Sequence, residues 1–512
     1  MVAGMRASKK PTPPKSKTQQ WRAWKNLNLT DARVAIDDEE LAWLENAMLV
    51  GKGAIQILPG PGDSIATVAA GPVTIWGFTL GTTPVLITVN SDGSMSQITT
   101  GGVVTAVCAA GIVTTSASLA IWRNSPILIG DPTKGYFSWD GTTFTVIDAT
   151  KVCTSLAVFE GRVWLANGRE ITYTAPNSFS DFTVGNGSGS TTITDEAFPG
   201  AIEDLHSALE QLWISGEGAI EALSNVTVDT GPPVVTSFSV TNIVSNVGVA
   251  HDAMTTGYFR SLVVPSSFGI YALSGVTPQK ISDKLDGLFP SLTLSGGPPA
   301  VAVIQNLMCL LLLVTYNGSN AQAQAAAGNT NPIPMLLGFT QGKWFLAVQG
   351  TSLRSITTVL VNGVAQAWGT DGSHVYRLFG ASASTAVAWK VQSRLYDFGL
   401  ATRWKQVLKI GVEFQASISI SPTMTVDSET SSRNVAVTSG NLLDLINATD
   451  DVLTIIGASG QTLQLVGQGI VQSRADAPFG GHYLGLTLSG NDPPFRIQAM
   501  QMEYIPNVSE WS

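Results

Sequence analysis

The stretch ILIGDPTKGYFSWDGTTFTVI, residues 127–147, decides the fold, because it is a strand-turn-strand unit that recurs about every 36 to 50 residues. The clearest further copies are LAVFEGRVWLANGREITYT (156–174) and LVVPSSFGIYALSGVTPQKI (262–281). The same shape occurs around 84–98, 206–223 and 365–379. Repetition at this period is typical of β-propeller blades. It favours a scaffold that presents loops around an axis over an enzyme.

The spacing of the central strands sets the number of blades. These strands centre near Leu86, Leu128, Trp164, Trp213, Val263 and Leu312, and two more hairpins follow at 338–348 and 368–379. The expected turns are Asp-Gly or Asn-Gly pairs, which tolerate the positive φ of tight hairpins. They begin at Asp92, Asp140, Asn317, Asn362 and Asp371. We expect six or seven irregular blades over residues 63–390, although several stacked sheets would give similar signals.

Both flanks of the propeller have a different pattern. Residues 1–25 form a basic flexible arm, and residues 26–62 are expected to be a helical segment and linker. In IDDEELAWLENAML (36–49) acids fill the first turn and apolar residues share a face, which predicts a helix. LPGPG (58–62) marks a stiff boundary. From 391 to 512, longer alternating strands predict a C-terminal β-sandwich. The expected fold class is therefore all-β.

The composition indicates a subunit of a large assembly. Charged residues make up only 13% of the chain, yet the longest apolar run, Leu307 to Val314, is too short to cross a bilayer. Few charges without a membrane span suggest a surface covered by other protein, with no stable membrane insertion. The three cysteines form no metal or disulfide pattern. The start of the chain lacks a secretory signal, so we expect assembly in a reducing cytoplasm.

The charge distribution is asymmetric. Residues 1–25 carry seven basic residues and no acid, whereas the rest of the chain has a net charge of −16. The arm could dock on an acidic partner or nucleic acid, or it could remain a solvated tail. Two tryptophans supply apolar anchors at its end. The candidate arm residues are Arg6, Lys9, Lys10, Lys15, Lys17, Trp21, Arg22, Trp24 and Lys25.

Catalytic patterns are missing from the sequence. The four histidines are scattered singly, there is no phosphate-binding loop, and Asp397-Phe398-Gly399 lacks the partner motifs of a kinase. SDGS (91–94) and TDGS (370–373) lack the spacer of the Asp-box of propeller glycosidases, and arginines for a sialic acid are not evident. We therefore predict no catalytic residue, no metal site and no cofactor, and expect the protein not to be an enzyme.

Two insertions interrupt the strand pattern. GNGSGSTTITDE (185–196) reads as an exposed connection between blades, and NAQAQAAAGNTNPIP (320–334) is a long Ala/Gln tract. A loop of small uncharged residues can pack into a narrow space or against another subunit. The tract is the candidate tip or axial loop, with a disordered surface loop as the alternative. Its candidate residues are Ala321, Gln322, Ala323, Gln324, Ala325, Ala326, Ala327 and Gly328.

The order of these features resembles a known family. GKGAIQILPG (51–60) precedes the hairpins, VFEGRVWLANGREITYTAPNSFSDF (158–182) and NVGVAHDAMTTGYFRSLVVPSSFGIYALSG (246–275) lie within them, and RLYDFG (394–399) and RWKQVLKIGVEF (403–414) open the final part. This layout resembles the tail hub, or nozzle, proteins of short-tailed double-stranded DNA phages, also called DNA-stabilisation proteins. The resemblance covers most of residues 50–510 and consists of layout and short phrases.

The resemblance implies a virion protein of the phage tail, assembled in the host cytoplasm. It implies a ring of six copies below the portal that binds the head-to-tail adaptor, tail fibres or spikes, and a plug or needle protein. Double-stranded DNA would pass through the ring without sequence recognition, and an acidic body would let it slide. The alternatives are a phage tail or baseplate protein that binds a host receptor, and a propeller glycosidase acting on host surface glycan.

Overall fold

The structure is a computed structural model. It describes residues 15–231, 234–251, 253–275, 277–295, 297–321, 332–349, 352–380, 386–416, 420–436, 455–456, 462–463 and 470–506. Its regular elements are strands and three short 3₁₀ helices, η1 (Val184–Asn186), η2 (Asp283–Leu285) and η3 (Phe289–Ser291). The prediction of an all-β chain is confirmed. The chain divides into two compact units, one made of residues 58–387 and the other of residues 1–57 and 388–512.

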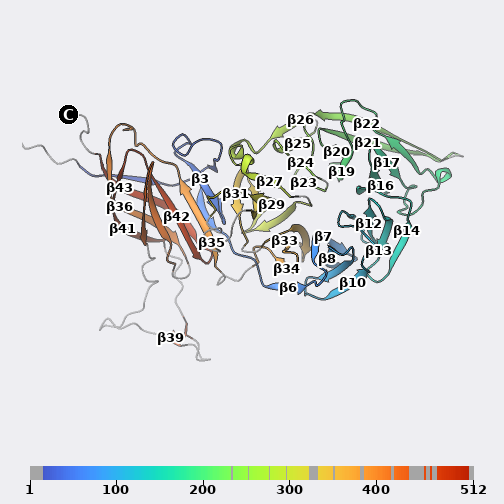
Figure 1. The fold of residues 1–512 in the computed structure, drawn as a ribbon, viewed down its shortest axis with the longest axis horizontal. Helices are drawn as coiled ribbons and strands as arrows, with labels where there is room; N and C mark the ends of the chain where they lie inside the picture. Colours follow the sequence, from blue (N-terminus) through green and yellow to red (C-terminus); the bar gives the residue numbers. More distant parts are fainter. Residues whose placement is uncertain are drawn as a thin grey trace, which may run out of the picture. The chain divides into compact units, whose positions relative to one another are not determined.

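Residues 58–387 form a propeller of seven antiparallel blades (Figure 1). The first five blades are four-stranded, and their strands follow in chain order from the innermost to the outermost. Blade 1 consists of β7 (Pro72–Leu80), β8 (Thr83–Asn90), β9 (Met95–Thr99) and β10 (Val104–Cys108). Blade 2 consists of β11 (Ser118–Ile121), β12 (Ile127–Asp131), β13 (Gly135–Trp139) and β14 (Phe144–Asp148). Blade 3 consists of β15 (Ser155–Phe159), β16 (Arg162–Asn167), β17 (Glu170–Tyr173) and β18 (Gly189–Thr192).

The next two blades keep this order. Blade 4 consists of β19 (Ile202–Ala208), β20 (Gln211–Gly216), β21 (Ala219–Asp229) and β22 (Val235–Ser245). Blade 5 consists of β23 (Thr256–Tyr258), β24 (Ser261–Ser266), β25 (Gly269–Ser274) and β26 (Thr277–Lys280). Part of the insertion at 185–196, expected to be a plain loop, forms β18, the outer strand of blade 3.

The last two blades complete the propeller. Blade 6 consists of β28 (Ala300–Ile304), β29 (Leu307–Tyr316), β30 (Ile333–Thr340) and β31 (Lys343–Ala347), and β27 (Leu292–Leu294) also pairs with β29. Blade 7 consists of β32 (Ser355–Val361), β33 (Val364–Thr370) and β34 (His374–Arg377), and its outer strand is β6 (Ser64–Thr67). Because β6 precedes blade 1 in the chain, its pairing with β34 joins the two ends of the propeller.

The six predicted central strands are all second strands of blades, which confirms the repeat. Trp164 lies in β16 and Trp213 in β20, and both side chains are at most 1% exposed because other blades cover the two faces of these strands. The predicted Asp-Gly turns join neighbouring strands. In one of them, N–H groups of Thr143 and Thr142 donate to Asp140 and hold the pKa of its carboxyl below the usual range.

The second unit contains two β-sheets. One sheet has the order β4 (Ala47–Val50), β5 (Ala54–Ile57), β43 (Arg496–Pro506), β36 (Lys405–Gln415), β41 (Ile470–Gly481), and β1 (Lys17–Trp21) also pairs with β43. The other has the order β3 (Glu40–Glu45), β35 (Val387–Ser393), β42 (Leu484–Asp492), β37 (Thr423–Ser428), β38 (Ser432–Ala436), and β2 (Asn26–Leu27) pairs with β3. The strands β39 (Ile455–Ile456) and β40 (Thr462–Leu463) pair with each other in a separate two-stranded sheet.

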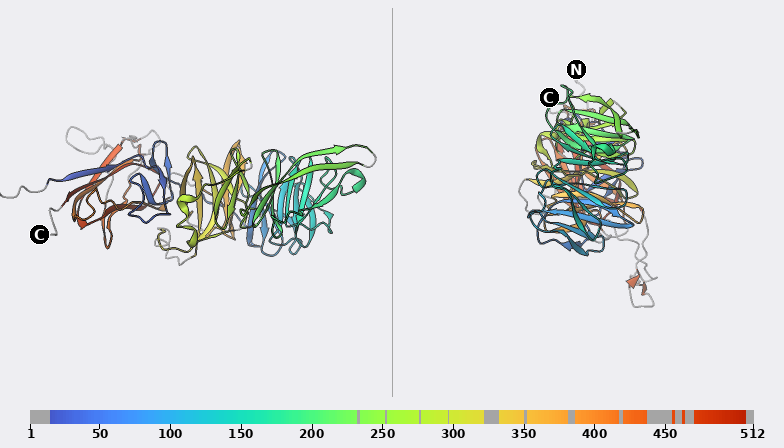
Figure 2. Two further views of the ribbon diagram at one scale, coloured as in Figure 1. Left: turned by 90° about the horizontal axis from the view of Figure 1, so that it is seen from above. Right: turned by 90° about the vertical axis from the view of Figure 1, so that its right-hand side faces the viewer.

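Aromatic side chains link the two sheets. Trp389 of β35 and Phe414 of β36 both pack edge-on against Phe495, with ring centroids 5.3 and 5.5 Å apart. All three are at most 2% exposed, which places the core between the sheets (Figure 2). This arrangement is the expected sandwich.

The predicted helix at 36–49 is wrong. Glu40–Glu45 is strand β3 and Ala47–Val50 is strand β4, and Asn46 between them has a left-handed φ of 49°. Both faces of β3 are covered, so Trp43 and Glu45 are buried side by side and the Trp43 Nε1–H donates to Glu45 Oε2 at 2.9 Å. Pairing with β35 and β5 therefore overrides the local helix pattern.

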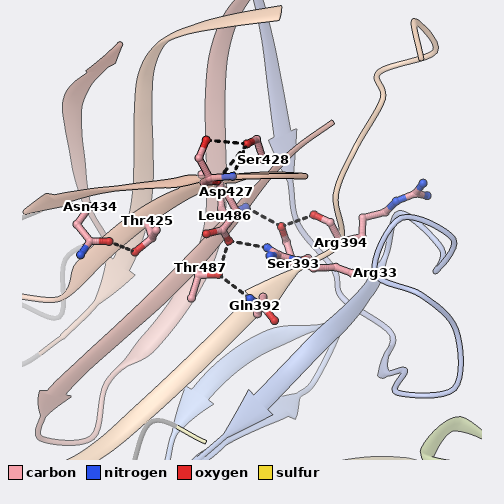
Figure 3. Close-up of polar contacts among 11 residues, drawn as sticks. Arg33, Gln392, Ser393, Arg394, Thr425, Asp427, Ser428, Asn434, Leu486 and Thr487 are labelled. Atoms are coloured by element: carbon pink, nitrogen blue, oxygen red, sulfur yellow. Dashed lines mark hydrogen bonds and ion pairs between the residues drawn. The ribbon is translucent and has the colours of Figure 1, made fainter. Parts of the chain in front are cut away.

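The segment expected to be a linker is part of the sandwich unit. Arg33 donates to Asp427 Oδ2 and to the Ser393 carbonyl oxygen, both at 2.7 Å, and thereby joins the N-terminal segment to β37 and β35 (Figure 3). The Leu486 N–H of β42 donates to Ser393 Oγ at 2.9 Å. The boundary between the units falls at Leu58, the first residue of the LPGPG stretch that was expected to mark a boundary.

Candidate functional site

The first strands of successive blades enclose a pocket of about 310 Å³ in the propeller. Its size is at the lower end of the range for small-molecule sites. Blades 1 to 5 and the residues before blade 6 contribute to its wall. The side chains that line it include Trp76, Phe78, Ser118, Ser155, Asp204, His206, Thr255, Pro298 and Pro299.

Hydroxyl groups at this wall join neighbouring blades. The Leu156 N–H of blade 3 donates to Ser118 Oγ of blade 2 at 3.3 Å, and the Leu205 N–H of blade 4 donates to Ser155 Oγ of blade 3 at 2.9 Å. Outside the pocket lining, Ser355 Oγ of blade 7 accepts the Ile75 N–H of blade 1 at 3.2 Å in the same way. These serines accept hydrogen bonds from backbone N–H groups that have no partner in the strand ladders. Their hydroxyls therefore hold neighbouring blades together.

Asp204 makes the equivalent connection from blade 4 to blade 5. It is 4% exposed, and its carboxylate accepts hydrogen bonds from the Thr255 N–H at 3.0 Å and from the Thr255 hydroxyl. Ser155 Oγ lies 3.4 Å from the other carboxylate oxygen. Because a buried carboxylate needs such donors, Asp204 is best described as a brace between two blades.

His206 is the one imidazole at this wall, and its geometry does not form a catalytic triad. Burial lowers its pKa to about 4, so the ring is neutral at physiological pH and is a weak base. The hydroxyl of Ser155 hydrogen bonds to Asp204, and no hydrogen bond joins it to His206. The pocket could accept a small neutral ligand, but its polar groups are arranged for structural support.

The described residues contain neither a reactive thiol nor a cluster of metal-ligating side chains. Cys153 and Cys309 are buried and Cys108 is half-buried, and burial raises their pKa values to about 12, 11 and 11. These thiols are therefore protonated and unreactive at neutral pH. Among the residues that the structure describes, no three His, Cys, Asp or Glu side chains gather to hold a metal ion, and no helix could cross a membrane.

The predicted arm residues lie partly inside the sandwich unit. Arg6, Lys9 and Lys10 are outside the described residues, and Lys15 is exposed. Lys17–Trp21 pairs with β43, and Trp21 and Trp24 are 5% and 1% exposed. The two tryptophans therefore anchor the chain to its own core, which corrects the expectation of a free arm for residues 17–25. The reason is that Trp21 stacks on Tyr396, with ring centroids 4.5 Å apart.

The end of the arm borders a second pocket, of about 830 Å³, in the sandwich unit. Arg22 forms an ion pair at 2.7 Å with the buried Glu413, and Lys52 and Arg496 also line the pocket. Lys25 pairs with Glu39 at the surface. Two of the predicted arm charges are thus engaged within the chain.

The candidate tip loop lies mostly outside the described residues, which include only Ala321 of the eight residues from Ala321 to Gly328. Ala321 itself is 3% exposed. The tip hypothesis for the remaining seven residues stays a prediction.

An arc of exposed apolar side chains runs over four consecutive blades. Leu209 in blade 4 and Phe259 in blade 5 lie in the turn between the first and second strands, and Phe259 is 75% exposed. Val303 and Met308 in blade 6 are cross-strand partners next to the same turn, and Leu360 and Val364 lie on the two sides of this turn in blade 7. Equivalent turns of successive blades lie on one face of a propeller. We call these six residues the apolar arc.

Sequence reasoning missed both the braces and the apolar arc. The braces have a local signal, a serine directly before an apolar residue at the start of a first strand, as in Ser118-Leu119, Ser155-Leu156 and Ser355-Ile356. The arc has none, because its members are spread over residues 209–364 and meet only when the blades are arranged around the axis.

Comparisons with known proteins do not identify a family. No family model and no curated protein match the chain. Among solved structures, BBS1N in complex with ARL6DN is similar at 8% identity and a TM-score of 0.40, covering 63% of this chain and 96% of that one. A streptogramin B lyase is similar at 12% identity and a TM-score of 0.38, covering 62% and 96% of the two chains. BamB from Moraxella catarrhalis is similar at 10% identity and a TM-score of 0.36, covering 66% and 98%. None of the three is a phage tail protein, and the description of the fold above depends on the chain's own sheets.

Proposed function

We propose that this chain is a structural subunit of a short-tailed phage: a propeller-bearing protomer of the hub or nozzle ring that extends the DNA channel below the portal and adaptor. The ring would have six copies, retain the packaged genome and support its ejection. The family resemblance supplies the virion setting, and the surface of the propeller supports a role in assembly.

The apolar arc is the observation that carries this proposal. Single exposed apolar residues are ordinary, but a run of them over four consecutive blades on one face is typical of a protein-binding surface. Phe259, at 75% exposure, would be its central anchor, because a large aromatic side chain gains most from being covered. A chain with only 13% charged residues also has few groups that would resist such burial.

The pocket enclosed by the first strands of the blades limits where DNA could pass. A pocket of about 310 Å³ has the size of a small-molecule site and is far too narrow for a duplex. In the proposed ring we therefore place the channel between copies rather than through a propeller. Outside residues 1–25 the chain has a net charge of −16, which disfavours binding to phosphates and would let DNA slide.

Electron microscopy of the purified protein mixed with head-to-tail adaptor tests the proposal. We expect a closed ring with an axial pore. Phe259→Asn should weaken assembly, and asparagine suits the φ of 53° at this position. Phe268→Asn is the matched control, because Phe268 is 76% exposed in the same blade but lies in the turn between the second and third strands, on the opposite face.

Other outcomes would favour the alternatives. A receptor-binding tail protein would bind host cells by itself and form no ring with the adaptor. A glycosidase would release sugar from host glycan and lose that activity when two facing acids are replaced. Equal loss of assembly in both phenylalanine variants would show that the apolar arc is not the contact face.

A further inference from the structure

Strand β22 is an unusual outer edge for a blade of this propeller. It has eleven residues, whereas the outer strands of the other blades have four or five. One side pairs with β21, and no strand of the described residues pairs with the other side. Its sequence, VTSFSVTNIVS, contains no charge and no proline. Native proteins usually protect exposed edges with charges, prolines or short strands, so a long uncharged edge is suited to pairing with another chain.

The β21–β22 hairpin is held in place by blade 3. Phe238 packs edge-on against Trp164 and Tyr173, with ring centroids 5.6 and 5.7 Å apart. Thr236 Oγ1 donates to the Gly187 carbonyl oxygen at 2.7 Å and accepts a hydrogen bond from Arg162 at 2.6 Å. Figure 2 shows the hairpin extending past the shorter strands of the propeller. Because the edge is already ordered, a strand that pairs with it loses less free energy to ordering the hairpin.

An acidic pocket of about 290 Å³ lies beside this edge, between β18 and the hairpin. Its wall includes Asp195, Glu221 and Asn242. Asn242 and Glu221 are cross-strand partners, so their side chains share one face of the blade. Glu221 is 2% exposed, and no described residue donates a hydrogen bond to its carboxylate. Burial and the neighbouring Asp195 raise the pKa of Glu221, and the positive charge of Arg169 partly offsets this rise.

The nearby polar groups are otherwise engaged. Arg169 donates to the carbonyl oxygens of Ile193 and Asp195, at 2.8 and 2.7 Å. The Asp195 carboxylate accepts hydrogen bonds from Asn242 Nδ2 and from the Ala197 N–H, both at 2.8 Å. Arg169 acts on Glu221 only through its charge, without a hydrogen bond, so Glu221 is the carboxylate left for a direct ion pair with a basic side chain from outside. A largely buried carboxylate without hydrogen-bond donors from the protein is costly, and a lysine or arginine side chain would lower that cost.

We propose that β22 and this pocket receive residues 1–14 of a second copy of the chain as an added strand, with a basic side chain seated against Glu221. The inference rests on the proposed ring. Among the segments outside the described residues, residues 1–14 alone carry lysine or arginine, namely Arg6, Lys9 and Lys10, and they contain no acid. A residue opposite Asn242 on an added strand would lie about 5 Å from it on the same face, within reach of Glu221 for a long side chain.

Binding of a labelled peptide of residues 1–14 to the protein lacking these residues tests the inference, with fluorescence anisotropy as the readout. We expect saturable binding that Glu221→Gln weakens at least tenfold. Val240→Lys, which places a lysine of the same chain at the pocket wall, should weaken it similarly. Glu217→Gln is the matched control, because Glu217 is exposed in the turn between β20 and β21 of the same blade and should change binding less than twofold.

Three results would overturn the inference: no binding of the peptide, equal binding by the Glu221→Gln variant, or equal binding of a scrambled peptide with the same composition. The ring proposal fails separately. Rings formed by the protein lacking residues 1–14, together with no peptide binding, would refute this site and leave the ring. Peptide binding without any ring on the adaptor would refute the ring and leave a site for the N-terminal segment.

Discussion

Replacing Asp204 by alanine should loosen the junction between blades 4 and 5. The carboxylate accepts two hydrogen bonds from Thr255, one from its N–H at 3.0 Å and one from its hydroxyl. Thr255 is 4% exposed, so water cannot readily replace the lost acceptor. Asp204→Asn keeps one side-chain oxygen that can accept the Thr255 N–H, and it therefore separates the loss of charge from the loss of the acceptor.

The expected magnitude follows from these contacts. A hydrogen bond to a charged group contributes about 1.5 to 3 kcal/mol, and a buried donor left without a partner costs about 1 to 3 kcal/mol. Removing the carboxylate also relieves its own desolvation, so we expect a net loss of about 3 kcal/mol for Asp204→Ala and about 1 kcal/mol for Asp204→Asn. The larger value corresponds to an increase of roughly 150-fold in the opening equilibrium of the junction.

Hydrogen exchange of the Thr255 amide, followed by mass spectrometry on peptides spanning 253–258, measures this opening. Exchange should accelerate by roughly 100-fold in Asp204→Ala and by less than tenfold in Asp204→Asn. The Ile75 amide, which donates to Ser355 at the junction of blades 7 and 1, should keep its rate. Asp229→Ala is the control variant, because Asp229 is exposed at the end of β21 in the same blade. Unchanged exchange in Asp204→Ala, or equal acceleration by the two Asp204 variants, would refute the role of Asp204 as a hydrogen-bond acceptor that braces the two blades.

Three further changes test the energetics of both units. Because burial and Asp195 raise the folded-state pKa of Glu221, its protonation favours folding at low pH and this contribution is lost as pH rises through that pKa. Glu221→Gln should therefore raise the Tm at pH 8 and leave it nearly unchanged at pH 4, and a lower Tm at pH 8 would contradict this. Trp21→Ala should cost about 3 to 5 kcal/mol in denaturant unfolding of the sandwich unit, and a loss below about 1 kcal/mol would show that the stack on Tyr396 is unimportant. Arg33→Ala should cost about 3 kcal/mol because it leaves Asp427 without its guanidinium, and the double change with Asp427→Ala should cost less than the two single changes combined.

Local patterns were sufficient to predict the blades. The second strands are apolar on both faces, and residues such as Asp140 and Asn362 begin turns whose geometry depends on one or two residues. Strand identity and tight turns are short-range properties, so they can be read from the sequence. The closing strand β6 could not be predicted in this way. Its sequence, SIAT, becomes a blade strand only by pairing with β34, about 310 residues later in the chain.

The candidate sites depended on the tertiary structure. The sequence 36–49 has a helical pattern, yet pairing with distant strands makes it β3 and β4. Trp21 and Trp24 looked like anchors for another protein, and the sandwich core of their own chain covers them. Glu221 looks like any strand acid in the sequence, but folding buries it beside Asp195.

The sequence by itself determined an all-β chain with blades that recur about every 36 to 50 residues and a basic N-terminal segment, because these follow from neighbouring residues and from composition. The tertiary structure alone decided the closure by β6, the braces at Ser155 and Asp204, the apolar arc and the pocket at Glu221. Each of these joins residues that are far apart in the chain, and such contacts exist only after the blades have packed around their axis.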